Sequence, residues 1–169
     1  MNVDPLSFEL FPPKTKQGLE KLHTAWRQLN TLSPSYFSVT FGAGGSTQDT
    51  TLAVVNDLRA QRIRVAPHLS CIGLQRSQIK DLLAEYIESG IRDLVVIRGD
   101  FVEDQKTIQD GFQYADELVA FVRQQTGDHF HIKVAAYPEV HPQALNAHID
   151  LEHFKRKVDA GADVAITQY

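Results

Sequence analysis

The hydrophobic positions of this chain form two alternating patterns. Short apolar runs, rich in β-branched and aromatic residues, occupy residues 7–11, 36–41, 65–71, 93–97, 131–136 and 164–168, and such runs predict strands. Between them, apolar residues recur every three or four positions, which predicts amphipathic helices. The recurring residues are Leu19, Leu22, Trp26 and Leu29; Val54, Val55 and Leu58; Ile79, Leu82, Leu83, Tyr86 and Ile87; Phe112, Ala115, Leu118, Val119 and Val122; and Leu151, Phe154 and Val158. Alternating strands and helices predict an α/β protein with a parallel sheet.

The two kinds of connection have different compositions. Links from helix to strand are short, and Gly90 and Gly161 suit the left-handed turn that ends a helix. Links from strand to helix are longer and carry the polar residues, and ligands bind at the carboxyl ends of parallel strands. Arg98 and Asp100 stand at such an end, directly after the strand at 93–97. Arg98 and Asp100 could belong to a ligand-binding site, or they could form a structural ion pair with no other role. This stretch alone leaves both interpretations open.

Two parallel architectures agree with this pattern, an open doubly wound sheet and part of an eightfold barrel. Both are built from right-handed strand–helix–strand units. The length of 169 residues favours the open sheet, because a full barrel needs roughly 250 residues. No linker or low-complexity segment divides the chain, so we expect a single domain over residues 1–169.

Composition narrows the functional classes. The chain is 43% apolar and 22% charged, as is usual for globular domains, and its net charge of −4 argues against a nucleic-acid surface. A single cysteine, Cys71, excludes a disulfide framework, suits a reducing compartment and is expected in the core. The polar, Pro-containing N-terminus is not typical of a signal peptide, and no apolar run approaches ~18 residues, so we expect neither a signal peptide nor a membrane span. We therefore expect a cytoplasmic protein.

Six segments at the expected strand ends become informative when they are read together. In chain order they are FELFPPK (8–14), VTFGAGG (39–45), HLSCI (68–72), RGD (98–100), AAYPEVHP (135–142) and AITQ (165–168). This series resembles the methylenetetrahydrofolate reductase family over the whole chain. Six ordered motifs are far more specific than any one of them, since a glycine-rich turn such as residues 42–45 is common in proteins that bind no phosphate.

The resemblance implies a (β/α)8 TIM-type barrel, of which about six of the eight βα units are present, with FAD held on its carboxyl rim. NADH or NADPH would reduce the flavin, which would pass hydride to 5,10-methylenetetrahydrofolate and give 5-methyltetrahydrofolate. By resemblance, Glu9 is the acid that protonates the folate, Asp100 is the carboxylate beside flavin and folate, and Gln168 meets folate and nicotinamide. The positions that match flavin contacts are Thr40, Phe41, Ala43, His68, Arg98, Gly99, Asp100, Tyr114, Ala115, Tyr137, His141, Ala144, Asp150, His153, Arg156 and Lys157. His153 stands where some relatives carry Asn.

The residue types fit this chemistry. A carboxylic acid donates a proton at neutral pH only if its pKa is raised, and Glu9, between Phe8 and Phe11, is expected to be partly desolvated. Asp100 would stay ionised and stabilise the positive iminium form of the folate. Arg98 and Lys157 offer positive charge for a pyrophosphate.

The chain departs from the family pattern in length. Family members carry about eight strands, and this sequence ends after the sixth expected strand. A barrel that lacks two of its eight strands would expose unpaired strand edges. We therefore expect either a fragment of a longer protein or a homo-oligomer in which another copy closes the gap, with weak or absent turnover.

Two other functions stay open. One is a non-catalytic flavin- or folate-binding module derived from the reductase. The other is a hydrolase or lyase on an open sheet that uses Glu9, His68 and Asp100 with a metal ion. His129 and His131 share a strand face but lie at the start of the strand, away from the rim, so no metal site is predicted.

Overall fold

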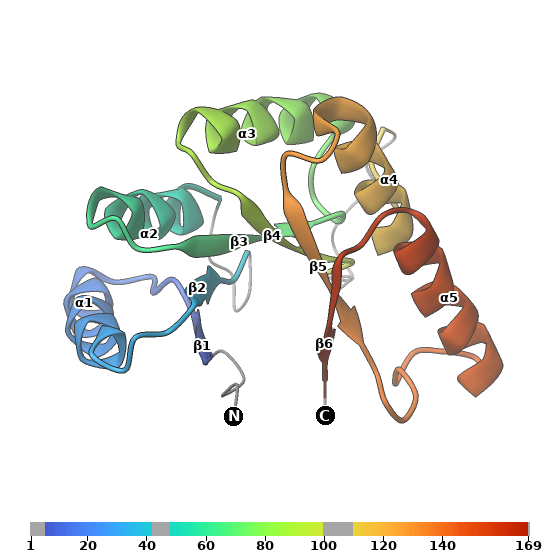
Figure 1. The fold of residues 1–169 in the computed structure, drawn as a ribbon, viewed down its shortest axis with the longest axis horizontal. Helices are drawn as coiled ribbons and strands as arrows, with labels where there is room; N and C mark the ends of the chain where they lie inside the picture. The colour runs from blue at the N-terminus through green and yellow to red at the C-terminus, as the bar shows by residue number, and fades with distance from the viewer. Residues whose placement is uncertain (1–5, 42–47, 100–109, 169) are drawn as a thin grey trace. The chain divides into compact units, whose positions relative to one another are not determined.

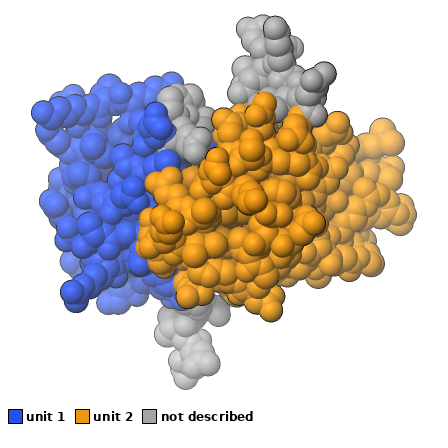
Figure 2. All heavy atoms as spheres, turned by 90° about the horizontal axis from the view of Figure 1, so that it is seen from above, with its two compact units in different colours: residues 1–68 blue, residues 69–169 orange. Residues whose placement is uncertain are grey.

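The computed structural model describes residues 6–41, 48–99 and 110–168. The chain forms two compact units, Met1–His68 and Leu69–Tyr169 (Figure 2). The expectation of a single domain over residues 1–169 stays a prediction. In each of them parallel strands alternate with helices (Figure 1), which confirms the α/β class.

Unit 1 contains β1 (Ser7–Leu10), α1 (Lys16–Asn30), β2 (Tyr36–Val39), α2 (Gln48–Ala60) and the first four residues of β3 (Val65–Ser70). Helix α1 begins where the Thr15 side chain accepts a hydrogen bond from the Gly18 N–H at 3.1 Å. Strand β1 pairs with β2, and β2 pairs with β3. The buried apolar side chains among the described residues of this unit include Leu10, Trp26, Phe37, Val39, Val54, Val55, Leu58, Val65 and Ala66.

Unit 2 contains the end of β3, α3 (Arg76–Glu88), β4 (Asp93–Ile97), α4 (Ala115–Thr126), β5 (His131–Ala136), α5 (Ala147–Asp159) and β6 (Val164–Thr167). Strand β4 pairs with β5, and β5 pairs with β6, all parallel. Gly90 and Gly161 have φ of +70° and +109° and end α3 and α5 as expected. The helices α3 and α4 bury Ile79, Leu82, Leu83, Tyr86, Leu118, Val119 and Val122.

Strand order decides between the two predicted architectures. The Cys71 N–H donates to the Ile97 carbonyl at 3.1 Å and the Ile72 N–H donates to the Arg98 carbonyl at 3.2 Å, so the chain leaving β3 lies beside the end of β4. A doubly wound sheet of order 3-2-1-4-5-6 would separate these two strands, and the order 2-1-3-4-5 would separate β2 from β3. Neighbours that follow chain order are the arrangement of a barrel. The open sheet, which chain length had favoured, is therefore wrong.

Two helix predictions need correction. Phe112 was expected on the fourth helix, but α4 begins at Ala115, and Phe112 packs just before it with its ring centroid 5.1 Å from that of Phe121. The stripe of α5 was expected to be buried, but Leu151 and Val158 are 64% and 48% exposed and α5 has no buried residue. Periodicity predicts which side chains share a face, whereas burial also needs an apolar surface opposite them.

Candidate functional site

The carboxyl ends of the strands in unit 1 bring Glu9 and His68 together. Glu9 on β1 pairs in register with Ser38 on β2, and Ser38 pairs with Ala66, two residues before His68 on β3. Side chains two residues apart on a strand share a face, and Nε2 of His68 lies 3.3 Å from Oε2 of Glu9. That nitrogen is not aligned for a hydrogen bond with any described residue, so the contact is an ion pair when the ring is protonated.

The electrostatics of Glu9 differ from the expectation. The pKa of its carboxyl is held below the ordinary value, chiefly by the contact with His68; partial burial opposes this shift, while the His68 charge and the Ser38 hydroxyl add to it. The expected desolvation is small, because the Glu9 side chain is 46% exposed and Phe11 is 61% exposed. The prediction of a raised pKa is therefore wrong for the chain without ligands, in which Glu9 is ionised at neutral pH.

Thr40 presents an unsatisfied hydroxyl at the same rim. Its backbone carbonyl accepts a hydrogen bond from the buried Thr51 hydroxyl at 3.0 Å, which fixes the end of β2 to α2. The Thr40 side chain is 5% exposed, and its Oγ1 has no hydrogen-bond partner among the described residues. Phe41 beside it is half-buried, whereas Ala43 lies outside the described residues.

In unit 2, Arg98 and Gly99 directly follow β4, and hydrogen bonds from residues at the end of β3 hold the Arg98 carbonyl in place. The Arg98 carbonyl oxygen accepts from the Ser70 hydroxyl at 3.1 Å and from the Cys71 thiol at 2.9 Å. Burial raises the pKa of the Cys71 thiol to about 12, which agrees with its expected place in the core and makes it a poor nucleophile. Asp100 lies outside the described residues.

The rim of β5 is tied to Arg98 by polar contacts. The Arg98 guanidinium donates to Oε1 of Gln143, and the Gln143 N–H donates to Nδ1 of His141 at 3.0 Å. Because Nδ1 accepts, the other ring nitrogen of His141 carries the proton. The His141 N–H donates to Asp150 at 3.0 Å, and the Tyr137 ring packs edge-on against the His141 ring, 4.4 Å between centroids.

Helices α4 and α5 contribute a second set of the predicted flavin contacts. Tyr114, directly before Ala115 at the start of α4, stacks on His153 of α5 with ring centroids 5.0 Å apart. Nδ1 of His153 is buried and has no hydrogen-bond partner within the described ranges. Lys157 donates from Nζ to the Ala135 carbonyl at 2.5 Å, and burial lowers the pKa of its ammonium group, opposed by Asp150.

The remaining predicted residues are less constrained. The Ala144 N–H donates to the His141 carbonyl at 2.8 Å, so Ala144 belongs to the same turn. Arg156 on α5 is exposed. Gln168 follows β6 and is exposed, and its N–H donates to the Ala136 carbonyl at 2.8 Å, which places it beside the end of β5.

Sequence reasoning missed Ser38, Ser70 and Gln143. Ser38 lies two residues before Thr40, and Ser70 lies two residues after His68 and directly before Cys71. The register that pairs Glu9 with Ser38 would have pointed to Ser38. Gln143 lies in a loop, where side-chain direction has no periodic signal. None of the three carries a distinctive residue type, since serine and glutamine are common on any surface.

The metal-dependent alternative gains no support from the geometry. Within residues 6–41, 48–99 and 110–168 no group of three or more His, Cys, Asp or Glu side chains could hold a metal ion. His129 contacts the Arg92 guanidinium through Nδ1 and the Ile91 carbonyl through Nε2. Both ring nitrogens are thus used. His129 precedes β5, which begins at His131, so the expectation that the two histidines share a strand face is wrong. No helix in these ranges is both long and apolar enough to span a bilayer.

Comparison with known proteins places the chain in a family. The methylenetetrahydrofolate reductase family matches residues 2–169. The chain belongs to the methylenetetrahydrofolate reductase family. It is 41% identical over 165 residues to the 5,10-methylenetetrahydrofolate reductase of Pectobacterium carotovorum and 38% identical to that of Escherichia coli K12; each alignment covers 97% of this chain and 54% of the relative. It is also 38% identical to methylenetetrahydrofolate reductase (NADH) 1 of Zea mays, covering 96% of this chain and 30% of the relative.

The chain spans about half the length of the bacterial members of the methylenetetrahydrofolate reductase family that it matches. Solved structures resemble it in fold at low identity. A phosphonomutase from Burkholderia cenocepacia aligns with 96% of the chain and 68% of its own, at a TM-score of 0.62 and 15% identity. A Clostridium thermocellum protein that binds 5-methyl-5,6,7,8-tetrahydrofolic acid aligns with 97% of the chain and 54% of its own, at a TM-score of 0.60 and 14% identity. This likeness shows the barrel-type α/β fold.

Proposed function

We propose that this chain binds FAD and takes part in the reduction of 5,10-methylenetetrahydrofolate to 5-methyltetrahydrofolate, with NADH or NADPH as the electron donor. Its membership of the methylenetetrahydrofolate reductase family supports the reaction class. The observation that carries the cofactor part is a set of buried polar atoms without hydrogen-bond partners. Among the described residues these include Thr40 Oγ1 and His68 Nε2 in unit 1 and His153 Nδ1 in unit 2.

Such atoms are rare, because leaving a buried polar atom unpaired costs about 1–3 kcal/mol. The family resemblance assigns these three residues to flavin contact, whereas the described residues hold two more such atoms, Trp26 Nε1 and Tyr86 Oη, that it does not assign. FAD carries ring nitrogens, hydroxyls and phosphate oxygens, which are groups that can pair with a threonine hydroxyl or an imidazole nitrogen of this kind, so within each unit these residue types fit FAD. Arg98 and Lys157 would hold its pyrophosphate by charge, and Tyr114 and Tyr137 offer flat faces to its rings. When bound, FAD supplies hydride transfer between the nicotinamide and the folate.

The residues of the chain would supply binding and proton handling. Glu9 is ionised without ligands, so it can donate a proton only after the folate displaces water and raises its pKa. The His68 ring lies beside this carboxylate, with Nε2 3.3 Å from Oε2 of Glu9. In this proposal Asp100 stabilises the positive iminium form of the folate, and Gln168 contacts the folate and then the nicotinamide.

A second candidate is a flavin- or folate-binding module that does not turn over. The lowered pKa of Glu9 favours it, because an ionised carboxyl cannot act as an acid. Addition of NADH or NADPH distinguishes the two functions. Only the reductase would allow the nicotinamide to reduce a bound flavin, which bleaches the flavin absorption. We further propose that the chain assembles into a homo-oligomer, which the exposed apolar side chains of Leu151 and Val158 support. We also propose a cytoplasmic location, which the free thiol of Cys71 supports.

FAD titration of Thr40→Val tests the cofactor proposal. Valine keeps the shape of threonine but removes the unpaired hydroxyl, so FAD affinity should fall by about tenfold while the unfolding free energy of the cofactor-free protein is unchanged or slightly higher. Thr31→Val is the matched control: it removes a hydroxyl that donates to the Gln28 carbonyl after α1, at the opposite edge of the strands. Equal FAD affinity for Thr40→Val and the wild type would contradict a contact between Thr40 and the cofactor.

A further inference from the structure

Three consecutive residues at the end of β3 donate to one carbonyl oxygen. The oxygen of Arg98 lies 3.1 Å from Ser70 Oγ, 2.9 Å from Cys71 Sγ and 3.2 Å from the Ile72 nitrogen. A carbonyl has two lone pairs, so three donors saturate it. Ser70 and Cys71 are 5% and 1% exposed, which shields these bonds from competing water. We refer to Ser70 and Cys71 together as the clasp.

Gly99 is fitted to the same clasp. Its φ of +84° is a conformation that residues with a Cβ rarely adopt, and a Cβ added to it would meet Ser70 Oγ at 2.2 Å. Ser70 therefore holds the carbonyl before Gly99 and fills the space beside Gly99. Ser70 Oγ also accepts from the Ile72 N–H at 3.2 Å, an N–H that it shares with the Arg98 carbonyl. The Ile72 carbonyl, 3.3 Å away, is a second acceptor for the Ser70 hydroxyl, and the Arg98 carbonyl at 3.1 Å is the nearer of the two.

The clasp fixes a donor as well as an acceptor. The Arg98 carbonyl and the Gly99 N–H belong to one planar trans peptide and point in opposite directions. Holding the oxygen against β3 therefore sets the direction of the Gly99 N–H. The Arg98 side chain leaves the same point and reaches Gln143 in the loop after β5. A fixed peptide with a cation beside it is suited to a ligand that presents both an acceptor atom and negative charge.

We propose that Ser70 and Cys71 are positioning residues of the flavin site, acting through Arg98 and Gly99. This inference rests on the proposed function, since it assigns the clasp a role in FAD binding and not only in joining β3 to β4. It also explains why a thiol of high pKa stands in a site region: Cys71 serves as a hydrogen-bond donor and not as a nucleophile.

A matched pair of variants at Cys71 tests the role. Cys71→Ala removes the donor and Cys71→Ser retains one. We expect the Kd for FAD to rise by about three- to tenfold in Cys71→Ala and about tenfold in Ser70→Ala, and to stay within about twofold of wild type in Cys71→Ser. Thr126→Val is the control, because it removes a hydroxyl that donates to the Val122 carbonyl at the C-terminal end of α4, and it should leave FAD binding unchanged.

NMR of the cofactor-free protein separates failure of this inference from failure of the proposed function. Loss of a donor should move the carbonyl carbon resonance of Arg98 upfield and shift the amide resonance of Gly99 in Cys71→Ala and Ser70→Ala, and Cys71→Ser should restore both. If the resonances do not respond, the clasp is absent and the inference is overturned. If they respond while FAD affinity is unchanged, the clasp is only structural and the positioning role is overturned. A wild-type protein that binds no FAD would overturn the proposed function, and with it the cofactor role of the clasp.

Discussion

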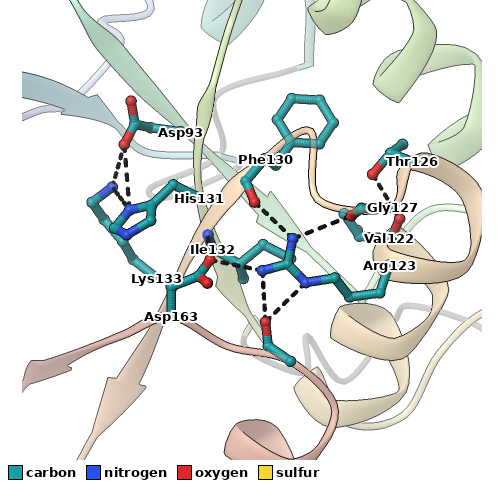
Figure 3. A network of polar contacts seen from close by, with 11 residues as sticks. Asp93, Val122, Arg123, Thr126, Gly127, Phe130, His131, Ile132, Lys133 and Asp163 are labelled. Carbon is teal, nitrogen blue, oxygen red and sulfur yellow. Dashed lines mark hydrogen bonds and ion pairs between the residues drawn. The ribbon is translucent and has the colours of Figure 1, made fainter.

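Replacing Lys133 by methionine should destabilise unit 2 strongly. Lys133 on β5 donates from Nζ to Asp93 Oδ1 at 2.6 Å, and the two side chains are 5% and 1% exposed (Figure 3). Nδ1 of His131 lies 3.3 Å from the same Nζ. Methionine fills a similar volume but removes the ammonium group nearest to the buried Asp93 carboxylate; Nδ1 of His131 is farther away, at 3.7 Å, and is charged only when the ring is protonated. Removing one partner of a buried ion pair costs about 3–5 kcal/mol, because the remaining charge stays desolvated.

Urea unfolding followed by far-UV circular dichroism measures this loss. For a chain of 169 residues, a loss of 3–5 kcal/mol lowers Tm by about 6–20 °C. The double variant Asp93→Asn with Lys133→Met is the control: it removes both charges and should regain most of the lost stability, since an apolar or neutral replacement of a buried pair is often nearly neutral. Lys133→Met within about 1 kcal/mol of wild type would refute the claim that the buried charge dominates.

Three further outcomes follow from individual contacts. Gly161→Ala should lower stability by about 1–3 kcal/mol, because a Cβ at this φ of +109° would meet the Arg123 side chain at 3.0 Å and disturb the two hydrogen bonds from Arg123 to the Gly161 carbonyl. Thermal melting measures this loss, and an unchanged Tm would contradict it. The pKa of Glu9 in the folded protein is below its ordinary value of 4.5. The stability that its contact with His68 contributes is therefore present above pH 4.5 and is lost as the pH falls through the lowered pKa. Glu9→Gln should therefore show a smaller stability loss than wild type between about pH 5.5 and about pH 3.5 in urea titrations, and an identical loss would argue against the pair. Cys71, buried and with its thiol pKa raised to about 12, should react with a disulfide reagent only after denaturation, whereas labelling of the native protein at the rate of a small thiol would show that it is accessible.

The strands and most helices could be predicted from sequence because burial repeats with a fixed period. Val65 to Ser70 and Leu94 to Val96 are buried as their apolar runs predicted. The strand order could not be predicted in this way, because it depends on which strands pair. The hydrogen bond from the Cys71 N–H to the Ile97 carbonyl, which argues against an open sheet, leaves no trace in a local pattern.

The sequence indicated which residues form the candidate site, but it did not indicate their protonation states or hydrogen-bond partners. The strand ends indicated Glu9, His68 and Arg98, because parallel strands present their carboxyl ends at one edge. The protonation of Glu9 could not be predicted, since its pKa is set by His68, 59 positions later in the chain and two strands away. The same holds for Ser70, whose partner Arg98 is 28 residues away.

The visible absorption spectrum of the protein with FAD, recorded before and after anaerobic addition of NADH or NADPH, tests the central claim most directly. The account predicts that FAD binds, that its absorption is perturbed by the protein, and that a reduced nicotinamide bleaches it. A protein that leaves the FAD spectrum unperturbed and retains no flavin after gel filtration would contradict the account.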